Sequence, residues 1–384
     1  MIIKPDFKTM LSELIAAPSV SSTSARHDQS NLPVINLLAT WLEPLGFKID
    51  IQPLPGQPNK ANLIATLGEG SGGLVFAGHT DTVPFDESGW YSSPLSLLER
   101  DNRFYGLGTC DMKGFFAIVI EALIPYLDKP LAQPIIILAT ADEESSMAGA
   151  QALAAAGKPK ARYAIIGEPT GMVPVYKHKS IMMQSISIEG KAGHSSNPLL
   201  GINALEIMHD VIGSLIDYRS QLQQQFTDPA FKVAYPTINL GCIHGGDNPN
   251  RICSHCELHF DTRLLPGMDN DGVSNNINEI VQSIASKRGV NIKLTPLIDG
   301  VEAFAQSLDS PLVAAAQKFT GNEAQSVAFA TEAPFLQNLG METLVLGPGD
   351  IDQAHQTNEF VDIDRIAPMK KVIQQLIERF CFES

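Results

Sequence analysis

Histidines and carboxylates follow four short apolar segments of the sequence. Each segment leads into residues that can bind a metal cation: His79 and Asp81 after 74–77, Glu143 and Glu144 after 134–139, Glu168 after 163–166, and His355 after 343–346. Asp111 lies in a further loop, before a helix predicted to begin near Phe115. In open α/β sheets, ligands bind outside the carboxyl ends of the strands. We therefore expect these side chains to converge on one edge of a sheet.

Two imidazoles and several carboxylates suit a pair of Zn²⁺ or Co²⁺ ions, whereas a site made only of oxygen ligands would favour Mg²⁺ or Ca²⁺. Each ion would take one histidine, one terminal carboxylate and a share of a bridging carboxylate. Paired ions lower the pKa of a water between them and stabilise the oxyanion that forms when this water attacks a carbonyl. The predicted cofactor is therefore two Zn²⁺ or Co²⁺ ions per subunit.

Glu143 and Asp81 are candidates for supporting roles. Glu143 stands beside Glu144, where it can take the proton of the attacking water and pass it to the leaving nitrogen. Asp81 lies two residues after His79, a spacing that suits a carboxylate holding the second ring nitrogen. Taken singly, each residue has an ordinary explanation, such as a polar pair or a solvated face. Their joint occurrence favours a metal site, because burying so many carboxylates without a cation is costly.

The four apolar segments also indicate the fold class. They are continuous rather than alternating, as in strands buried on both faces, and helix-like stretches at 115–126 and 149–156 separate them. The last segment, near the C-terminus, precedes an amphipathic helix over 366–380. We therefore predict an α/β domain that is interrupted in the middle of the chain and then resumes.

The interruption has a different pattern, because its strands alternate apolar and polar residues. Leu258 and Phe260, for example, alternate with His259 and Asp261, so one side of this strand is solvated. The predicted order is βαββαβ, with strands at 181–189, 237–243, 256–264 and 290–297 and helices at 204–218 and 273–287. We predict an inserted α+β domain over 179–297 and an α/β catalytic domain over 1–178 and 298–384.

Cys253 and Cys256 form a Cys-x-x-Cys pair with histidines nearby, which invites a structural-zinc interpretation. A second ligand pair at regular spacing is missing, and Cys256 shares its strand face with Leu258 and Phe260. We therefore predict that Cys256 is a small buried apolar residue and that His259 points to the other side.

The composition excludes several classes of function. The 384 residues include 27 Lys and Arg against 42 Asp and Glu, a formal net charge of −15, which does not suit binding to nucleic acid or an anionic membrane. The five cysteines are irregularly spaced, as in a reducing cytoplasm. Neither a secretory signal nor an apolar run of about 20 residues is present. We expect a cytoplasmic protein whose partner is a small molecule.

Eight segments of the sequence resemble one known family. They are GHTDTVPF, YGLGTCDMKGFFA, ILATADEESSMAGA, AIIGEPT, GHSS, HGGDNPNRIC, ATEAPF and LGPGDIDQAHQTNEF, and they span nearly the whole chain. They resemble the two-zinc aminoacylase, carboxypeptidase and succinyl-diaminopimelate desuccinylase family, and within it most closely the acetylornithine deacetylases. The resemblance implies a mixed-sheet, zinc-peptidase-like catalytic domain and an inserted domain that serves for dimerisation and as a lid.

The resemblance also implies roles for individual residues. It places His79 and Glu168 on one metal and Glu144 and His355 on the other, with Asp111 bridging, Asp81 orienting and Glu143 as general base. In the Gly-His-Ser segment, it implies that His194 stabilises the oxyanion in the active site of the partner subunit. From sequence alone, His194 is equally well explained as a loop histidine that caps the next helix.

Asn250 and Arg251 lie in a glycine-rich loop after a predicted strand, where an arginine can bind a substrate carboxylate with two hydrogen bonds. An ordinary surface arginine is the alternative.

The leading hypothesis from the sequence is a homodimeric metal-dependent amidohydrolase that deacetylates N-acetyl-L-ornithine in arginine biosynthesis. The substrate follows from the resemblance rather than from pocket chemistry. Alternatives are a desuccinylase or dipeptidase with the same metals, a catalytically silent metal-binding protein, and an interaction module built on the exposed sheet of the inserted domain.

Overall fold

The chain folds into two compact units. The computed structural model describes residues 6–382. Unit 1 combines the described residues up to Tyr176 with Gln306–Gln325 and the described residues from Thr331 onward, and unit 2 comprises Lys177–Ala305 with Ser326–Ala330. Unit 1 is therefore built from segments that lie on both sides of unit 2 in the sequence.

The larger sheet has nine strands, and its centre is parallel. The spatial order is β1 (Lys48–Leu54), β2 (Gln57–Leu67), β6 (Ile135–Thr140), β3 (Leu74–His79), β7 (Tyr163–Ile166), β15 (Glu342–Val345), β8 (Val175–His178) and β13 (Phe304–Ala305), with β14 (Gln325–Val327) beside β8. Strands β6, β3, β7 and β15 run parallel to one another, and the outer pairings β1–β2, β2–β6, β15–β8 and β8–β13 are antiparallel. The sheet is therefore mixed, as predicted.

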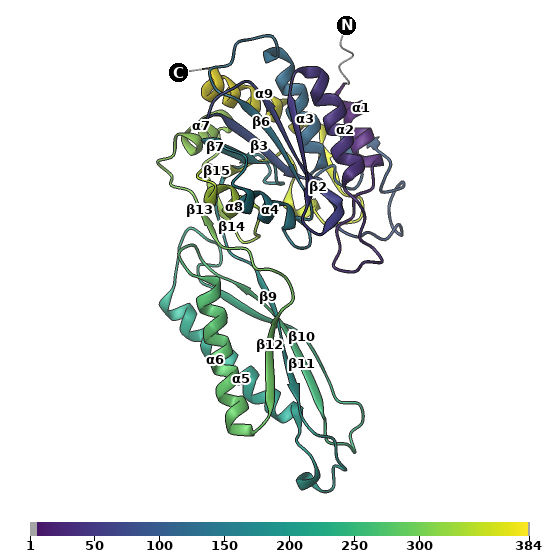
Figure 1. Cartoon of the computed structure of the whole chain (residues 1–384), viewed down its shortest axis with the longest axis vertical. Helices are drawn as coiled ribbons and strands as arrows, with labels where there is room; N and C mark the ends of the chain where they lie inside the picture. The colour runs from purple at the N-terminus through teal and green to yellow at the C-terminus, as the bar shows by residue number, and fades with distance from the viewer. Residues whose placement is uncertain (1–5, 383–384) are drawn as a thin grey trace. The chain divides into compact units, whose positions relative to one another are not determined.

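The central strands are continuous apolar segments because both faces of the sheet are covered. Phe76 pairs with Ile137 and Ile165, and Ile165 pairs with Leu344, so that these four buried side chains form a row across one face. The hydrophobic cluster on this face includes residues from α1 (Phe7–Ala16), α2 (Leu32–Leu42), α3 (Lys113–Leu123), α7 (Pro311–Thr320) and α9 (Ile366–Ile377). Helices α4 (Ala148–Ala156) and α8 (Ala333–Asn338) contact each other outside this cluster (Figure 1).

A small antiparallel sheet in unit 1 joins distant parts of the chain. Its strands are β4 (Leu98–Arg100), β5 (Arg103–Tyr105) and β16 (Phe360–Asp362), with β5 in the middle. Pairing of Phe360 with Tyr105 places Glu359 beside the loop that follows β5. This loop carries Asp111.

Unit 2 is a four-stranded antiparallel sheet with two helices packed on one face. The sheet order is β10 (Thr237–Gly245), β11 (His255–Arg263), β9 (Met182–Glu189) and β12 (Asn291–Pro296), and the helices are α5 (Ala204–Gln225) and α6 (Asn270–Arg288) (Figure 1). The chain order is βαββαβ, which confirms the prediction. Residues such as Ile186, Leu258 and Ile277 form a second hydrophobic core between the sheet and the helices.

The structure confirms the interruption and return of the α/β pattern, because β15 pairs with β7 in parallel. Helix α5 is longer than predicted and continues to Gln225. Cys253 and Cys256 are buried in the core of unit 2, and Cys256 packs there with Leu258 and Phe260, which confirms the predicted small buried apolar residue. Among residues 6–382, no helix is both long and apolar enough to cross a membrane.

Candidate metal centre

The candidate ligands lie at the carboxyl ends of the parallel strands in unit 1. His79 is the last residue of β3, and Glu168 follows β7 by two residues. Glu143 and Glu144 follow β6 in a turn where Asp142 has a φ of +59°. His355, in the segment after β15, also has a φ of +59°. Four chain segments that are distant in sequence thus deliver their side chains to one edge.

Asp111 lies between the two candidate histidines. Its Oδ1 is 3.0 Å from Nε2 of His79, and its Oδ2 is 3.5 Å from Nε2 of His355. On the side of His79, Oε1 of Glu168 lies 3.9 Å from the same ring nitrogen. On the side of His355, Oε2 of Glu144 lies 3.0 Å from the ring nitrogen. The five side chains therefore form one continuous group with Asp111 at its centre.

His79 and Asp81 contact each other, but mainly through the main chain. Nδ1 of His79 is 3.0 Å from the carbonyl oxygen of Asp81 and 3.7 Å from its carboxylate oxygen Oδ1. The other carboxylate oxygen of Asp81 accepts a hydrogen bond from the backbone N–H of Glu144. Asp81 therefore contacts the backbone of one candidate ligand as well as the ring of another.

Burial and mutual repulsion raise the proton affinity of three glutamates here. Burial, followed by the charge of Glu168, raises the pKa of Glu143 well above its ordinary value. Burial and the charge of Asp111 raise the pKa of Glu168 in the same way, and they also raise the pKa of Glu144. Carboxylates gathered in this way favour a bound cation, because a cation removes both the repulsion and the need for protons.

The histidines respond to the same carboxylates. Burial alone would lower the pKa of His79, but the hydrogen bond with Asp111 and the charges of Asp81 and Glu168 raise it well above the ordinary value. The hydrogen bonds with Asp111 and Glu144 raise the pKa of His355 to about 10. The net environment of both rings is strongly anionic.

The donor atoms fit divalent metal cations that bind nitrogen and oxygen. Ligand atoms of His79, Glu143 and Glu168 all lie within 4.8 Å of one another, and so do those of His79, Asp111 and Glu144. Oε1 of Glu168 and Oδ1 of Asp81 are buried and have no hydrogen-bond partner among the described residues. Histidine nitrogens and carboxylates are the donors that borderline divalent cations take in proteins.

Glu359 supports the Asp111 loop and was not singled out from the sequence. Its buried carboxylate accepts hydrogen bonds from the backbone N–H groups of Gly108, Cys110 and Asp111 at 2.8 to 3.1 Å. Burial and the charge of Asp111 raise the pKa of Glu359 to about 8. A carboxylate that receives three backbone donors fixes the loop, and so the direction of the Asp111 side chain.

Lys60 supports the Asp142–Glu144 turn and was also missed. Its Nζ lies 2.6 Å from Oδ1 of Asp142 and 2.8 Å from Oδ1 of Asp28. Lys60 and Asp142 are both buried. In the sequence Lys60 stands just before the apolar residues of β2, and in the structure it is the first residue of the buried segment of that strand. Its partner is 82 residues away and could not be read from the pattern.

Glu332 is a further buried carboxylate near the centre. Its Oε2 accepts a hydrogen bond from the Thr140 hydroxyl at 2.9 Å, and its Oε1 has no hydrogen-bond partner among the described residues. Burial raises the pKa of Glu332 to about 7, although the charge of His79 opposes this shift.

His194, Asn250 and Arg251 belong to unit 2, where they lie together. His194 and Arg251 form an isolated antiparallel bridge, and Ser195 donates a backbone hydrogen bond to the carbonyl of Asn250. Nδ1 of His194 accepts hydrogen bonds from the Ser196 hydroxyl and backbone N–H. Arg251 pairs with Asp247. Their roles toward substrate remain predictions.

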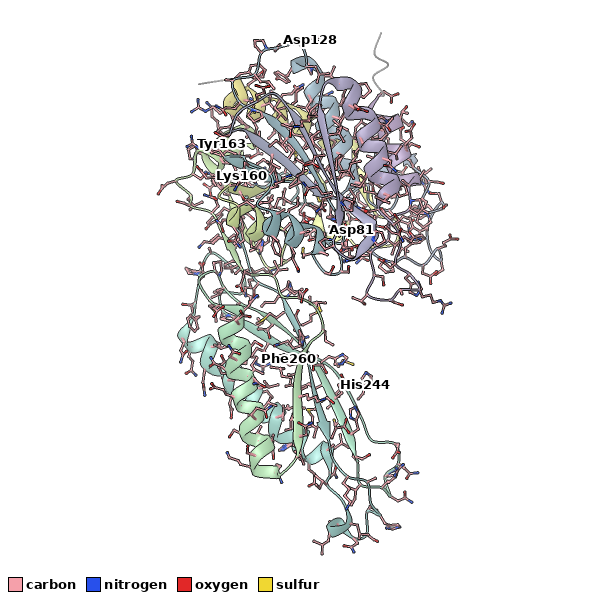
Figure 2. All side chains as sticks on the ribbon, viewed as in Figure 1. Asp81, Asp128, Lys160, Tyr163, His244 and Phe260 are labelled. Atoms are coloured by element: carbon pink, nitrogen blue, oxygen red, sulfur yellow. The ribbon has the colours of Figure 1, made fainter. Side chains whose placement is uncertain are left out.

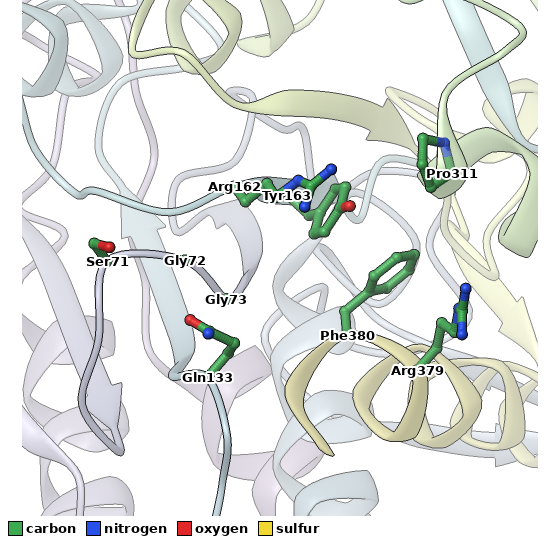
Figure 3. A pocket seen from close by; sticks show the side chains of 9 residues that line it. All are labelled: Ser71, Gly72, Gly73, Gln133, Arg162, Tyr163, Pro311, Arg379 and Phe380. Atoms are coloured by element: carbon green, nitrogen blue, oxygen red, sulfur yellow. The ribbon is translucent and has the colours of Figure 1, made fainter. Parts of the chain in front are cut away.

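Unit 1 also has a cavity of about 500 Å³ at the opposite ends of the strands. Tyr163, the first residue of β7, lines it with Gly73, Arg162, Arg379 and others (Figure 3). Figure 2 shows Tyr163 well away from Asp81, which marks the candidate centre. None of the candidate metal ligands lines this cavity, so we assign the candidate active site to the carboxyl ends of the parallel strands.

The fold and the centre define a class of hydrolase. Residues 75–379 match Peptidase family M20/M25/M40, which is most of the chain, so the chain belongs to this family. It is a metal-dependent hydrolase with a candidate ligand cluster. The resemblance inferred from the sequence motifs is confirmed.

Comparison with individual relatives points to one group within this family. An acetylornithine deacetylase of Photorhabdus laumondii is 48% identical over 380 residues, which cover 99% of this chain and 98% of the relative. An acetylornithine deacetylase of Proteus mirabilis is 48% identical over 377 residues, which cover 98% of this chain and 97% of the relative.

Solved structures share the fold at low sequence identity. A Staphylococcus aureus tripeptidase superposes with a TM-score of 0.76 at 19% identity and covers 99% of both chains. A dinuclear metal binding peptidase from Bacillus subtilis has a TM-score of 0.66 at 15% identity and covers 96% of each chain. These likenesses confirm the predicted fold class.

Proposed function

We propose that this enzyme hydrolyses N-acetyl-L-ornithine to L-ornithine and acetate, a reaction of arginine biosynthesis. The observation that carries the substrate is the 48% identity to relatives named acetylornithine deacetylase over nearly the whole chain. The candidate centre supports the reaction class, because its donors suit metal-assisted attack of water on an amide carbonyl.

We assign His79 and Glu168 to one metal ion, Glu144 and His355 to the other, and Asp111 to both, with Zn²⁺ or Co²⁺ as the ions. When bound, such ions lower the pKa of water and stabilise negative charge on the substrate carbonyl oxygen. The position of Asp111 supports this assignment, because its two oxygens face different histidines at 3.0 and 3.5 Å. The backbone contacts of Asp81 and Glu359 hold two of these ligands in place.

Glu143 is proposed as the general base. It follows Asp142 and precedes the candidate ligand Glu144, and its carboxylate lies within 4.8 Å of His79 and Glu168 donor atoms. Burial and the charge of Glu168 raise the pKa of Glu143, so its carboxylate takes up a proton readily. The same group can then return this proton to the nitrogen of ornithine as the amide bond breaks.

The first experiment measures amine release by chelator-treated enzyme to which Zn²⁺ or Co²⁺ is added back. N-acetyl-L-ornithine is compared with N-succinyl-diaminopimelate and a dipeptide. We expect metal-restored turnover with kcat/KM highest for N-acetyl-L-ornithine. A higher kcat/KM for another substrate would leave the proposed metal centre standing but refute the proposed substrate. Failure to bind metal would refute both the metal centre and the reaction.

The role of Glu143 is tested by Glu143→Gln. We expect kcat to fall by about 10² to 10⁴ while both metals are retained, because the amide cannot accept a proton. Glu99→Gln is a matched control, since Glu99 is an exposed glutamate that pairs with Lys8. Unchanged turnover in Glu143→Gln would remove Glu143 from the mechanism.

We also propose a homodimer in which unit 2 provides the contact. The support is the antiparallel sheet of unit 2, whose outer strands β10 and β12 can pair with another copy. Light scattering at micromolar concentration should give twice the mass of the chain. A monomer mass would refute this proposal.

A further inference from the structure

The face of the unit 2 sheet away from its helices carries four side chains of metal-ligand type. Cys242 and His244 lie on β10, and Glu257 and His259 lie on β11. Cys242 pairs directly with His259, and His244 pairs with Glu257, so the four occupy a rectangle on two neighbouring strands. Figure 2 shows His244 on the side of the sheet away from α5 and α6.

A β-bulge brings this set together. The register of β10 against β11 shifts between Leu240 and Cys242. Before the bulge, Leu240 is opposite Phe260, which faces the helical core. After it, Cys242 is opposite His259, so its thiol is turned to the open face. Bulges commonly re-aim side chains in this way.

The side chains already contact each other in pairs. Sγ of Cys242 is 3.0 Å from Nε2 of His244, and Nε2 of His259 is 3.1 Å from Oε1 of Glu257. The rings of His244 and His259 are 6.3 Å apart at an angle of 79°. Ser185 holds the Glu257 carboxylate by a hydrogen bond of 2.5 Å.

One ring nitrogen in this set is buried and only loosely paired. Nε2 of His259 is shielded from solvent, and its one close polar contact is with Oε1 of Glu257 at 3.1 Å, outside strict hydrogen-bond geometry. A histidine nitrogen and a carboxylate oxygen held side by side are two donor atoms of the kind that a Zn²⁺ or Co²⁺ ion takes. Directly opposed strand residues have Cβ atoms about 5 Å apart, a spacing from which two side chains can reach one ion.

We propose that Cys242, His244 and His259, with Glu257 as the fourth ligand, bind one Zn²⁺ or Co²⁺ ion on the open face of unit 2. One thiolate, two imidazoles and a carboxylate favour a tetrahedral borderline cation over Mg²⁺ or Ca²⁺. Binding releases the Cys242 thiol proton to solvent as the metal–sulfur bond forms. As the side chains stand they form two separate pairs, so binding requires side-chain rotation that brings the two pairs onto one ion. This site is independent of the proposed function.

Cobalt spectroscopy tests this site because the candidate centre of unit 1 has only nitrogen and oxygen ligands. Chelator-treated full-length protein is titrated with Co²⁺, and the near-ultraviolet thiolate-to-cobalt charge-transfer band and the bound metal after desalting are measured. We expect the band and one more ion per chain than in Cys242→Ser, which makes three if unit 1 binds two. In Cys242→Ser the band should disappear and the number of bound ions should fall by one.

Two matched variants complete the experiment. Cys253→Ser, in the buried core of the same unit, should keep the band and the third ion. His259→Gln, which leaves the thiol in place, should lose the third ion. Absence of the band in the wild-type protein, or its persistence in Cys242→Ser, would overturn the proposal, as would equal numbers of bound ions in the wild-type protein and Cys242→Ser.

Discussion

Replacement of Lys60 by methionine removes one partner of a buried ion pair in unit 1. The ammonium lies 2.6 Å from Asp142 and 2.8 Å from Asp28. Burial alone would lower the pKa of Lys60, but the hydrogen bonds with these two carboxylates raise it, so the lysine is charged. Methionine has a similar length and leaves the carboxylate of Asp142 without its cation.

The expected loss follows from the burial of each partner. Breaking a buried pair by removing one ion costs about 3–5 kcal/mol. The side chain of Asp28 is 33% exposed and can be solvated, whereas that of Asp142 is 5% exposed. Ser21 still donates a hydrogen bond to Asp142 in the variant, so we expect a loss of unfolding free energy at the lower end of this range, about 3 kcal/mol. For a unit of this size, we expect the melting temperature to fall by about 6–12 °C.

Scanning calorimetry measures this loss, with a double-mutant cycle to isolate the pair. Asp142→Asn combined with Lys60→Met should be more stable than the sum of the two single losses predicts, because neither charge is then buried alone. Lys8→Met is the matched control, since Lys8 pairs with Glu99 at the surface and should cost less than about 1 kcal/mol. A melting temperature for Lys60→Met equal to that of Lys8→Met would refute the reasoning.

Three further changes have expected outcomes. Burial lowers the pKa of His178 to about 4, so the unfolded chain binds a proton that the native state excludes, and stability falls as the pH drops from about 6.5 to about 4. Urea unfolding should show that the wild-type protein loses about 2 kcal/mol more unfolding free energy between pH 7 and pH 5 than His178→Gln does. An equal loss in both proteins would contradict this assignment. Asp269→Ala removes the N-cap of α6, which accepts from two backbone N–H groups, and should cost about 1 kcal/mol in the same assay, whereas Asp271→Ala should cost less. Glu359→Ala leaves three backbone donors of the Asp111 loop unpaired and should cost on the order of 3 kcal/mol in calorimetry; a cost below about 1 kcal/mol would show that solvent replaces the carboxylate.

The parallel core was predictable because burial on both faces leaves a continuous apolar segment. The expected segment 163–166 is β7, and 74–77 is the first part of β3. Because these strands were expected to be parallel, the residues that follow them were expected at one edge of the sheet. The structure brings His79, Asp111 and Glu168 together there, although no pattern in the sequence gives the distances between them.

Other features could not be predicted because they depend on contacts between distant segments. The partners of Glu359 are about 250 residues earlier in the chain, and a single glutamate beside a short strand has no periodic signal. Helix α5 was predicted to end near residue 218 because its last turns, rich in glutamine, have little apolar periodicity. In the structure Leu222 is buried there, which shows that tertiary packing extends the helix.

The position of β15 in the sheet affects the order in which a growing chain can fold. Val345 pairs with Ile166, so the open edge of β7 lacks its parallel partner until the ribosome has made the residues between them. At 5–20 residues per second, this interval is about 10–40 s, and the continuous segment of unit 2 is synthesised within it. During this time an apolar strand edge is exposed to other nascent chains. His355 emerges later still, so a chain released early would lack a candidate metal ligand as well as a closed sheet.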